Sequence, residues 1–233
     1  MGPLAMVHLS KTLDEEYLMQ TLEIPDFGAF DQAVGKFNRS ALCRGVSDSG
    51  YELKPSLFRG KKTDELKTLE SNLMWVFKTQ AKAHLATYPS SELEWLVLAQ
   101  HHGLPTRLLD WSLSPLAALF FAVQSRLDTD GAIYLLDRGK FRKEEDIDLK
   151  TLTEVVAFFP SHLSRRITAQ SGMFTAHPLT GNAFDEPDIV KLIIPAKSKK
   201  MLLAKLVKYG VHHGTIFPDL DGLSNYLRYL HRY

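Results

Sequence analysis

The sequence predicts an α+β fold in which helices flank a small mixed or split β-sheet within a single domain. Segments with apolar residues at helical spacing occur beside short apolar runs that are bounded by glycine, proline or aspartate. The two kinds of segment alternate irregularly, without the steady strand–helix–strand rhythm of a doubly wound parallel sheet. The chain has 233 residues, of which 45% are hydrophobic and 24% charged, and one hydrophobic core is sufficient for this length.

The predicted helices are marked by capping residues and by apolar periodicity. Asp26 is suited to cap the first helix and Ser91 the third. Pro115 is tolerated in the first turn of the fourth, which should be buried on nearly all sides because its apolar residues cannot all point one way. Gly210 closes the fifth. In chain order, the expected helices span residues 26–37, 64–88, 92–101, 115–123, 199–209 and 224–233.

The predicted strands are short apolar runs. The first is expected to end at a turn formed by Arg44 and Gly45, and Pro55 opposes a helix in the second. The clearest strand lies between Gly131 and Asp137. In chain order, the expected strands span residues 41–43, 53–58, 106–111, 132–136, 155–159 and 189–194.

Composition and charge argue against a general affinity for nucleic acid or membranes and against a membrane-spanning protein. The net charge of +1 gives no global field that would attract nucleic acid or an anionic membrane, so any basic site must be local. Cys43 is the single cysteine, and no signal peptide is recognised, which indicates a reducing cytoplasm. The longest apolar run, residues 113–123, is too short to span a bilayer, so no membrane partner is expected. Residues 1–6, which contain a second methionine, are interpreted as a cloning remnant, leaving 7–233 as the domain.

Several large enzyme classes are excluded by missing motifs. The sequence has no Walker A motif, no dinucleotide glycine fingerprint, no zinc-spaced cysteine pair and no nucleophile elbow.

The densest group of polar residues spans residues 100–112. Its imidazole, guanidinium, carboxylate, indole and hydroxyl groups must pair with one another or with a ligand, because each one buried unpaired would cost about 1–3 kcal/mol. In a purely structural interpretation, Arg107 and Asp110 form an ion pair and the histidines cap a helix end. His101 and His102 diverge as neighbours on a helix, so at most one should reach a site, and no metal is expected.

Arg44 and Gly45 form the second candidate site element. An arginine fork at the end of a strand suits a phosphate or pyrophosphate, and a glycine lets a ligand approach the backbone. Arg44 could equally be the partner of a buried carboxylate such as Asp110. In either case Arg44 and residues 106–112 are expected to line one pocket.

Two later segments carry weaker signals. Gln170 follows two arginines and lies either at a strand edge or in a turn beside a core phenylalanine. Asp219 and Asp221 stand on a turn where N-capping of the last helix is the default.

Several ordered motifs resemble a known family. They are Cys43-Arg44-Gly45, the run Leu53-Lys54-Pro55-Ser56-Leu57-Phe58-Arg59, the stretches 99–112 and 114–122, Gln170-Ser171-Gly172-Met173-Phe174, and residues 216–222. Together they resemble the FRG domain, a family found mainly in bacterial proteins and their phages. The resemblance covers roughly residues 40–227, after a helical N-terminal part that ends near residue 40. Cys43 stands where the family usually has an aromatic residue.

The layout of this family is similar to that of the ADP-ribosyltransferase superfamily, which implies an ADP-ribosyltransferase-like fold with NAD as substrate. Arg44-Gly45 matches the superfamily's NAD-holding element on the first strand. Trp111-Ser112 and the helix after it match the second element. The third element is a late carboxylate that supports an oxocarbenium-like transition state, and here the sequence departs from the pattern. Gln170 occupies a plausible place but is neutral, and Glu186 is the nearest suitable glutamate.

The resemblance therefore implies an NAD-using transferase. Arg44 would hold the pyrophosphate, one histidine of the pair would bond the adenine-side ribose, and Trp111 would stack on nicotinamide. Glu186 or Gln170 would orient a protein or nucleic-acid acceptor. The expected nucleotide-binding residues are Arg44, Gly45, His101, His102, Thr106, Arg107, Trp111 and Ser112, and the expected catalytic residues are Asp110, Gln170 and Glu186.

Two alternatives remain open. One is a non-catalytic nucleotide or nucleic-acid binding module, for which the six lysines between residues 191 and 208 offer a local basic stretch. The other is a different hydrolase or a toxin-type effector, in which the histidine pair and Asp110 act as acid–base groups.

Overall fold

The computed structural model describes residues 19–137, 141–161 and 164–232, and residues 1–6 lie outside this part of the chain. The strands are β1 (Gln20–Glu23), β2 (Leu42–Val46), β3 (Leu108–Ser112), β4 (Gly131–Leu136), β5 (Val156–Phe158), β6 (Gly172–Ala176) and β7 (Ile189–Ile194). The helices are α1 (Phe27–Val34), α2 (Thr63–Ala81), α3 (Glu92–His101), α4 (Pro115–Val123), α5 (Arg165–Ala169), α6 (Ala196–Lys208), α7 (His213–Ile216) and α8 (Leu220–His231). Short 3-10 turns lie at Ser56–Phe58, Lys82–His84 and Glu144–Asp146.

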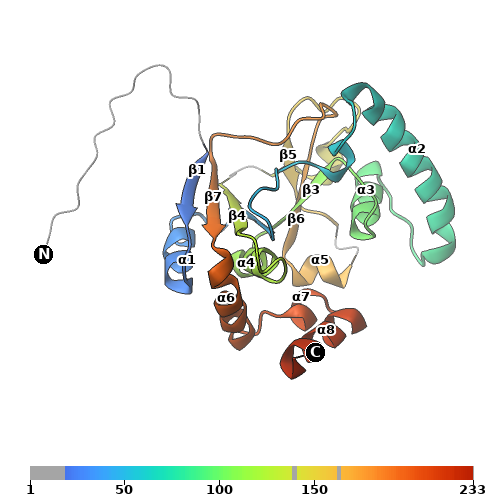
Figure 1. Cartoon of the computed structure of the whole chain (residues 1–233). Helices are drawn as coiled ribbons and strands as arrows, with labels where there is room; N and C mark the ends of the chain where they lie inside the picture. Colours follow the sequence, from blue (N-terminus) through green and yellow to red (C-terminus); the bar gives the residue numbers. More distant parts are fainter. Residues whose placement is uncertain (1–18, 138–140, 162–163, 233) are drawn as a thin grey trace, which may run out of the picture.

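The strands form one mixed sheet in the order β1-β7-β4-β2-β3-β6-β5, which confirms the α+β class (Figure 1). Strand β1 runs parallel to β7, and the other neighbours are antiparallel. With seven strands, the described sheet is larger than expected. It is one sheet, but β2 and β3 are joined through a single residue pair, Cys43 and Ser112. The two strands therefore diverge beyond this pair, and we call this place the β2–β3 split.

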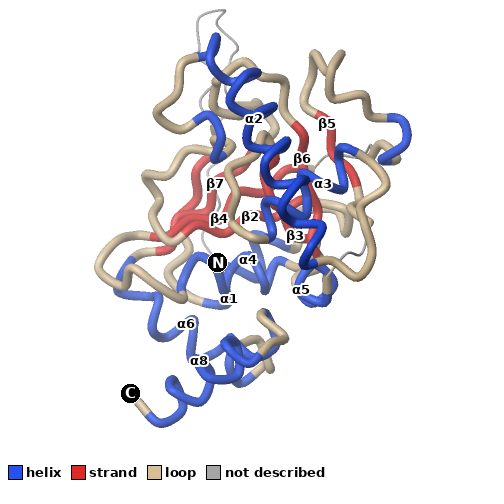
Figure 2. The backbone as a smooth tube through the Cα atoms, turned by 90° about the vertical axis from the view of Figure 1, so that its right-hand side faces the viewer, coloured by secondary structure: helices blue, strands red, loops and turns tan. Residues whose placement is uncertain are grey.

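Helices cover both halves of the sheet on the face that carries Cys43 and Ser112. Apolar side chains of α1, α4 and α6 pack on β2, β4 and β7, while α3 packs on β3, β5 and β6. Helix α2 lies outside α3, at the right of Figure 1, and Figure 2 views the two helices from that side. The opposite face is covered by the segments around Leu53 and Phe184. The β2–β3 split thus lies between two helical layers, one built on α4 and one on α3.

Strand β2 is longer than expected, and the predicted turn at Arg44 and Gly45 is wrong. The strand continues to Val46 because each of its residues pairs with β4. Gly45 lies where α4 crosses the strand: a Cβ atom at this position would be 1.8 Å from the carbonyl oxygen of Ala118. A glycine is therefore needed at position 45 because the backbone of α4 leaves no room for a side chain. The sequence suggested that a ligand approaches Gly45, but in the structure a helix lies against it.

Helix α4 confirms the expected buried helix. It starts at Pro115, and the Oγ atom of Ser114 accepts a hydrogen bond from the N–H of Ala117 (3.3 Å). Ala118 and Phe120 have no exposed surface, and most other residues of the helix are also buried. Asp26 and Ser91 likewise cap α1 and α3 through their side-chain oxygens, as predicted.

Other boundaries differ from expectation. The segment expected to extend from 53 to 58 contains a 3-10 turn, in which the N–H of Leu57 donates to the carbonyl oxygen of Thr106 (3.1 Å). Helix α2 ends at Ala81 and tightens into a 3-10 turn, so the helix expected to reach residue 88 is shorter. The sequence interpretation missed β1, α5, β6 and α7. Among the described helices, none is long and apolar enough to cross a membrane.

Candidate functional site

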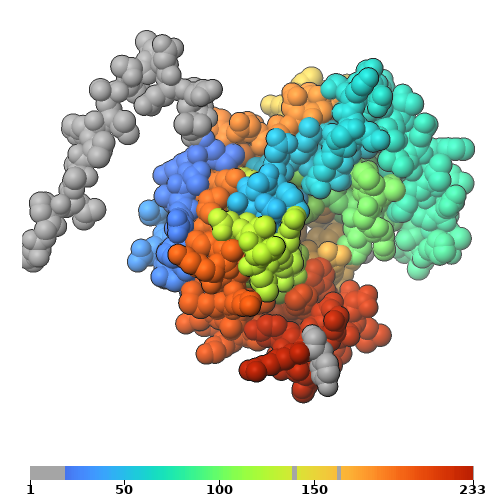
Figure 3. All heavy atoms as spheres, in the orientation of Figure 1, coloured from blue at the N-terminus to red at the C-terminus, as the bar shows by residue number. Residues whose placement is uncertain are grey.

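A small cavity of about 180 Å³ opens at the β2–β3 split, on the face between α3 and α4. The space-filling view shows a hollow near the centre of the molecule, between the green spheres of α3 and the red C-terminal helices (Figure 3). Its polar lining comes from four elements: β2, α3, β3 and the segment that begins with α5. The residues with polar side chains that line it are Arg44, Gln100, His101, Asp110, Ser112, Arg166 and Gln170.

Arg44 and Asp110 meet where the two strands diverge. The Nη1 atom of Arg44 donates to the carboxylate Oδ2 of Asp110 (2.5 Å) and to its backbone carbonyl oxygen (2.5 Å). The guanidinium of Arg44 thus connects the two strands at the β2–β3 split, where their backbones no longer form hydrogen bonds to each other. This geometry confirms that Arg44 shares a pocket with the end of the 106–112 segment. It also favours the second role considered for Arg44, that of partner to the carboxylate of Asp110.

The other carboxylate oxygen of Asp110 is held by Gln100. The Nε2 atom of Gln100 donates to Oδ1 of Asp110 (2.6 Å), while its Oε1 atom accepts from the hydroxyl of Thr106. Thr106 is fully buried, and its hydroxyl also accepts from the N–H of Leu108 (3.1 Å). Since the ionised carboxylate of Asp110 can only accept hydrogen bonds, the amide nitrogen of Gln100 must face it, and the amide oxygen is left to accept from Thr106. Thr106 therefore acts on the pocket indirectly.

Asp110 is an ionised group that faces the pocket. Burial by itself raises its pKa, but the charge of Arg44 and the hydrogen bonds from Arg44 and Gln100 outweigh this effect and lower the pKa below the ordinary value. Its side chain is 60% exposed and borders the cavity. The carboxylate is thus charged at neutral pH and accessible to a bound molecule.

The two adjacent histidines face different places, as expected from their spacing. His101 lines the pocket, whereas His102 lines an apolar groove between α2 and α3. Burial lowers the pKa of His101, and the positive charges of Arg166 and His102 lower it further against the opposing effect of Asp219. His101 is therefore neutral at pH 7 and can act as either donor or acceptor at the pocket wall.

The predicted ion pair between Arg107 and Asp110 is wrong. The guanidinium of Arg107 instead binds both carboxylate oxygens of Glu70 and donates to the carbonyl oxygen of Leu149 (2.9 Å). Its side chain is only 7% exposed, and it lies away from the pocket of Asp110. Arg107 fastens α2 to the loop before β5, so the structure gives it a packing role in place of the expected nucleotide contact.

Trp111 is placed on the opposite face of β3 from Asp110, because neighbouring residues of a strand alternate. Its indole ring is buried, donates through Nε1 to the Oγ1 atom of Thr175 (2.9 Å) and meets Phe184 edge-on. The ring is therefore unavailable for the expected stacking on nicotinamide. Ser112 is also engaged internally: its hydroxyl donates to the carbonyl oxygen of Gln170 (2.6 Å) and closes the end of β3.

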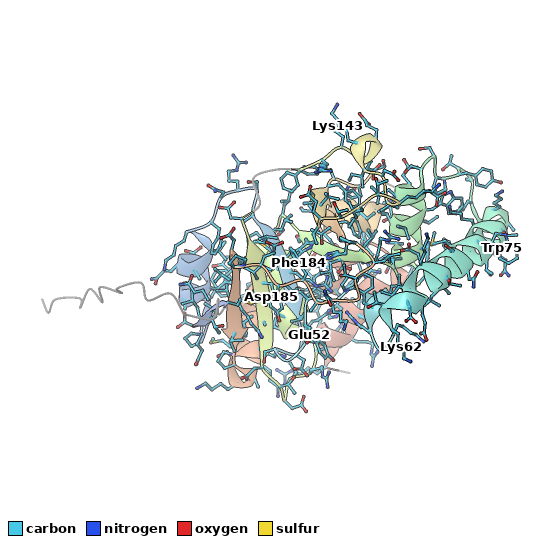
Figure 4. The ribbon with its side chains drawn as sticks, turned by 90° about the horizontal axis from the view of Figure 1, so that it is seen from above. Glu52, Lys62, Trp75, Lys143, Phe184 and Asp185 are labelled. Atoms are coloured by element: carbon cyan, nitrogen blue, oxygen red, sulfur yellow. The ribbon has the colours of Figure 1, made fainter. Side chains whose placement is uncertain are left out.

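Besides Asp110, the expected catalytic residues were Gln170 and Glu186. Gln170 lines the pocket, and its Nε2 atom donates to the carbonyl oxygen of Ile216 (3.2 Å), which ties α5 to α7. Glu186 lies in the loop before β7, two residues after Phe184. Figure 4 shows the neighbouring Phe184 and Asp185 beside Glu52. Since Phe184 packs on the face opposite Asp110, the loop of Glu186 lies across the sheet from the pocket.

The sequence analysis placed Gln100 in the polar run that was expected to form the pocket but gave it no role of its own, and it missed Arg166 as a pocket residue. Arg165 and Arg166 were noticed only as a pair, although on a short helix just one of two adjacent residues can face inward. Ile167 is buried on α5, and Arg166 beside it lines the pocket while Arg165 is exposed.

Cys43 lies in the pocket lining but offers no nucleophile. Burial raises the pKa of its thiol to about 12, so it stays protonated at neutral pH. In the part of the chain that the structure describes, no three histidine, cysteine, aspartate or glutamate side chains come together as a metal site would require.

Two larger hollows lie along α2. One, of about 710 Å³, is the mainly apolar groove that includes Leu73 and Phe77. The other, of about 800 Å³, surrounds the paired Arg107 and Glu70. Neither brings an ionised, accessible carboxylate together with a free cation and a neutral histidine. Because chemistry depends on converging polar groups more than on volume, the smaller pocket at the β2–β3 split is the candidate functional site.

The lysines between residues 191 and 208 do not form a continuous basic surface. Lys199 is fully buried, and its ammonium donates to the carbonyl oxygens of Ser47 (2.7 Å), Ser125 (3.2 Å) and Arg126 (2.9 Å). Lys191 donates to the carbonyl oxygen of Ser49 (2.7 Å). These charges hold α6 and β7 against the rest of the fold, so part of the basic stretch serves packing.

A comparison with protein families matched residues 39–131 to the FRG domain. Searches of curated proteins and of solved structures found no match. The matched part contains β2, α3, β3 and α4, and therefore Arg44, Gln100, His101 and Asp110 of the pocket. Arg166 and Gln170 lie beyond it. Over residues 39–131, the chain is thus similar to the FRG domain.

Proposed function

We propose that this protein is an NAD-using enzyme of the ADP-ribosyltransferase type, and that the pocket at the β2–β3 split binds the nicotinamide–ribose end of NAD. The observation that carries this proposal is the state of Asp110. Its carboxylate is ionised, fixed by Arg44 and Gln100, and open to the pocket. A fixed anion of this kind stabilises positive charge that develops during a reaction, without having to reorganise.

The reaction would proceed through a cation on the ribose. The bond between C1′ and the nicotinamide nitrogen breaks, its electron pair goes to the nicotinamide, and an oxocarbenium-like ribose remains. Asp110 stabilises this cation, as a carboxylate does in glycoside cleavage. A hydroxyl group of an acceptor, or water, then bonds to C1′ and releases its proton. Neutral His101, on the wall of the same pocket, is suited to accept that proton.

The size of the pocket limits which part of NAD it takes. Sites that enclose a drug-sized ligand usually measure about 300–1,000 Å³, whereas this cavity measures about 180 Å³. It suits one sugar and its base, and the second nucleotide would lie along the surface. Asp110 replaces Glu186 as the proposed catalytic carboxylate, since Glu186 belongs to a loop that packs across the sheet from the pocket.

A non-catalytic nucleotide-binding module is the second candidate. It is favoured by one observation: among the described lining residues, Asp110 is the single carboxylate, and it is already paired with Arg44. Binding of extended nucleic acid has less support, because Lys191 and Lys199 are engaged inside the fold.

The test is to measure NAD affinity by calorimetry and nicotinamide release by chromatography, using wild type, Asp110→Asn and Glu186→Gln. We expect Asp110→Asn to reduce release by about 100-fold or more while NAD still binds, because the lost interaction acts mainly in the transition state. Glu186→Gln should release nicotinamide at the wild-type rate, and thermal melts would verify that both variants fold. If wild type binds NAD saturably but releases no nicotinamide, the protein is a nucleotide-binding module and not an enzyme. Full activity of Asp110→Asn would remove Asp110 from the chemistry.

A further inference from the structure

Among the described residues, two arginines line the pocket, and one of them has an acidic partner. The charge of Arg44 is matched by Asp110. Arg166 forms no ion pair with any acidic side chain of the described residues, although it reaches the same cavity. An arginine that lines a pocket but is not paired with a carboxylate has its positive charge available to a ligand.

Among the described residues, no hydrogen bond uses the donors of the Arg166 guanidinium, which is held in place by an aromatic ring. Its central carbon lies 4.6 Å from the centre of the Phe217 ring, a cation–π contact that fixes the plane of the group and leaves its N–H edge free. Phe217 is in turn fixed edge-on against Phe121, with ring centres 6.0 Å apart. Arg166 is therefore presented to the pocket by two aromatic rings, one from the residue that follows α7 and one from α4.

The acidic groups near this wall of the pocket are already engaged. Asp219 accepts a hydrogen bond from the N–H of Gly222 (2.7 Å) as the cap of α8. Asp110 is bound to Arg44 and Gln100. The charge of Arg166 acts on the pocket itself, since it contributes with burial to the lowered pKa of His101. This wall is thus locally positive in a protein whose net charge is only +1.

We propose that Arg166 is the anion-binding residue of the pocket and that it takes a phosphoryl group of the ligand. Its planar fork matches two oxygens of a phosphate, which a single-point cation cannot do. If the proposed function holds, on which this assignment of the ligand rests, the group is the pyrophosphate of NAD. Arg44, for which the sequence suggested this role, instead holds Asp110. The pocket therefore has an anionic side for the ribose and a cationic side for the phosphates.

The experiment is a calorimetric titration with ADP-ribose, which contains the pyrophosphate but has no nicotinamide to lose. The variants are Arg166→Gln, Arg166→Lys and the matched control Arg165→Gln, which removes the same charge from the neighbouring exposed position. We expect Arg166→Gln to weaken binding by about tenfold or more. Arg166→Lys should fall between this variant and wild type, and Arg165→Gln should bind within about twofold of wild type. Thermal melts verify folding, and Arg166→Lys keeps the comparison informative if Arg166→Gln does not fold.

Inorganic pyrophosphate identifies the part of the ligand that is bound. It should compete with ADP-ribose in wild type, and this competition should weaken in Arg166→Gln. Unchanged ADP-ribose affinity in Arg166→Gln, equal losses in Arg165→Gln and Arg166→Gln, or no binding by wild type would each overturn the proposal. Nicotinamide release is measured separately. If wild type releases no nicotinamide but its ADP-ribose affinity depends on Arg166, the protein is not the proposed enzyme, and Arg166 is still the anion-binding residue.

Discussion

At the scale of single residues, the pocket depends on Gln100 as much as on the charged groups. Its amide has two ends, and each has one partner: Thr106 donates to the oxygen, and the nitrogen donates to Asp110. The buried hydroxyl of Thr106 therefore satisfies the amide oxygen while the amide nitrogen faces the carboxylate, which can only accept. A residue with little reactivity of its own thus helps to keep Asp110 ionised.

Replacing Gln100 with glutamate tests this role. In Gln100→Glu, one carboxylate oxygen can still accept from Thr106, but the other faces Asp110 without a proton to donate. We expect the pKa of Asp110 to rise, because a like charge replaces a hydrogen-bond donor. The acid limb of nicotinamide release should move to higher pH, since Asp110 must be ionised to act. Carbon-13 NMR titration of the carboxyl groups measures the first effect directly.

The control for this prediction is Gln32→Glu, which makes the same change at an exposed position of α1. It should leave the titration of Asp110 as in wild type. A titration curve for Asp110 that is identical in Gln100→Glu and wild type would mean that Gln100 does not tune the carboxylate.

At the scale of elements, the site is shaped by the close contact of α4 with β2. Ala118 of the helix lies directly over Gly45, so the backbones of the two elements meet without an intervening side chain. This contact brings the N-terminal part of α4 near the β2–β3 split, where Arg44 reaches across to Asp110.

The change Gly45→Ala should therefore destabilise the fold. The added methyl group would meet the carbonyl oxygen of Ala118 at 1.8 Å, and only a backbone shift can relieve this contact. We expect a loss of about 3 kcal/mol or more in the free energy of unfolding, measured by urea denaturation. Gly28→Ala in α1 is the control and should have a small effect, because its site is exposed and helical and the added Cβ would meet only the Oδ1 atom of Asp26, at 3.3 Å. Wild-type stability of Gly45→Ala combined with weaker NAD binding would instead assign Gly45 to the ligand.

The sequence predicted the elements with strong local signals. The caps Asp26 and Ser91, the first-turn Pro115 and the strand that starts at Ile189 were all located correctly. It missed β1 and β6, whose short runs become strands only because neighbouring strands supply hydrogen-bond partners. Strand β1, for example, gains its ladder from β7, which lies about 170 residues further along the chain.

At the scale of the whole molecule, the sequence located the pocket better than it assigned its residues. Arg44 and Asp110 were both recognised. Their pairing across 66 residues of sequence separation was one of two interpretations of Arg44, and Arg107 was considered as another partner of Asp110. The expected stacking of Trp111 on nicotinamide was wrong because Trp111 lies on the buried face of β3. Which face of a strand is buried depends on the segments that cover the sheet, and the local sequence does not show this. Arg166 reaches the pocket only through the packing of α5 against β6, which no local pattern reveals.

The central claim is that NAD binds at the β2–β3 split and not in the larger hollows along α2. The most direct measurement is a titration of nitrogen-15-labelled protein with NAD, followed through backbone amide shifts. We expect saturable shifts at Gly45, Ser112 and Gly172, which line the pocket. Shifts confined to the groove around Leu73 and Ala81, or the absence of any saturable shift, would mean that NAD does not bind at the β2–β3 split.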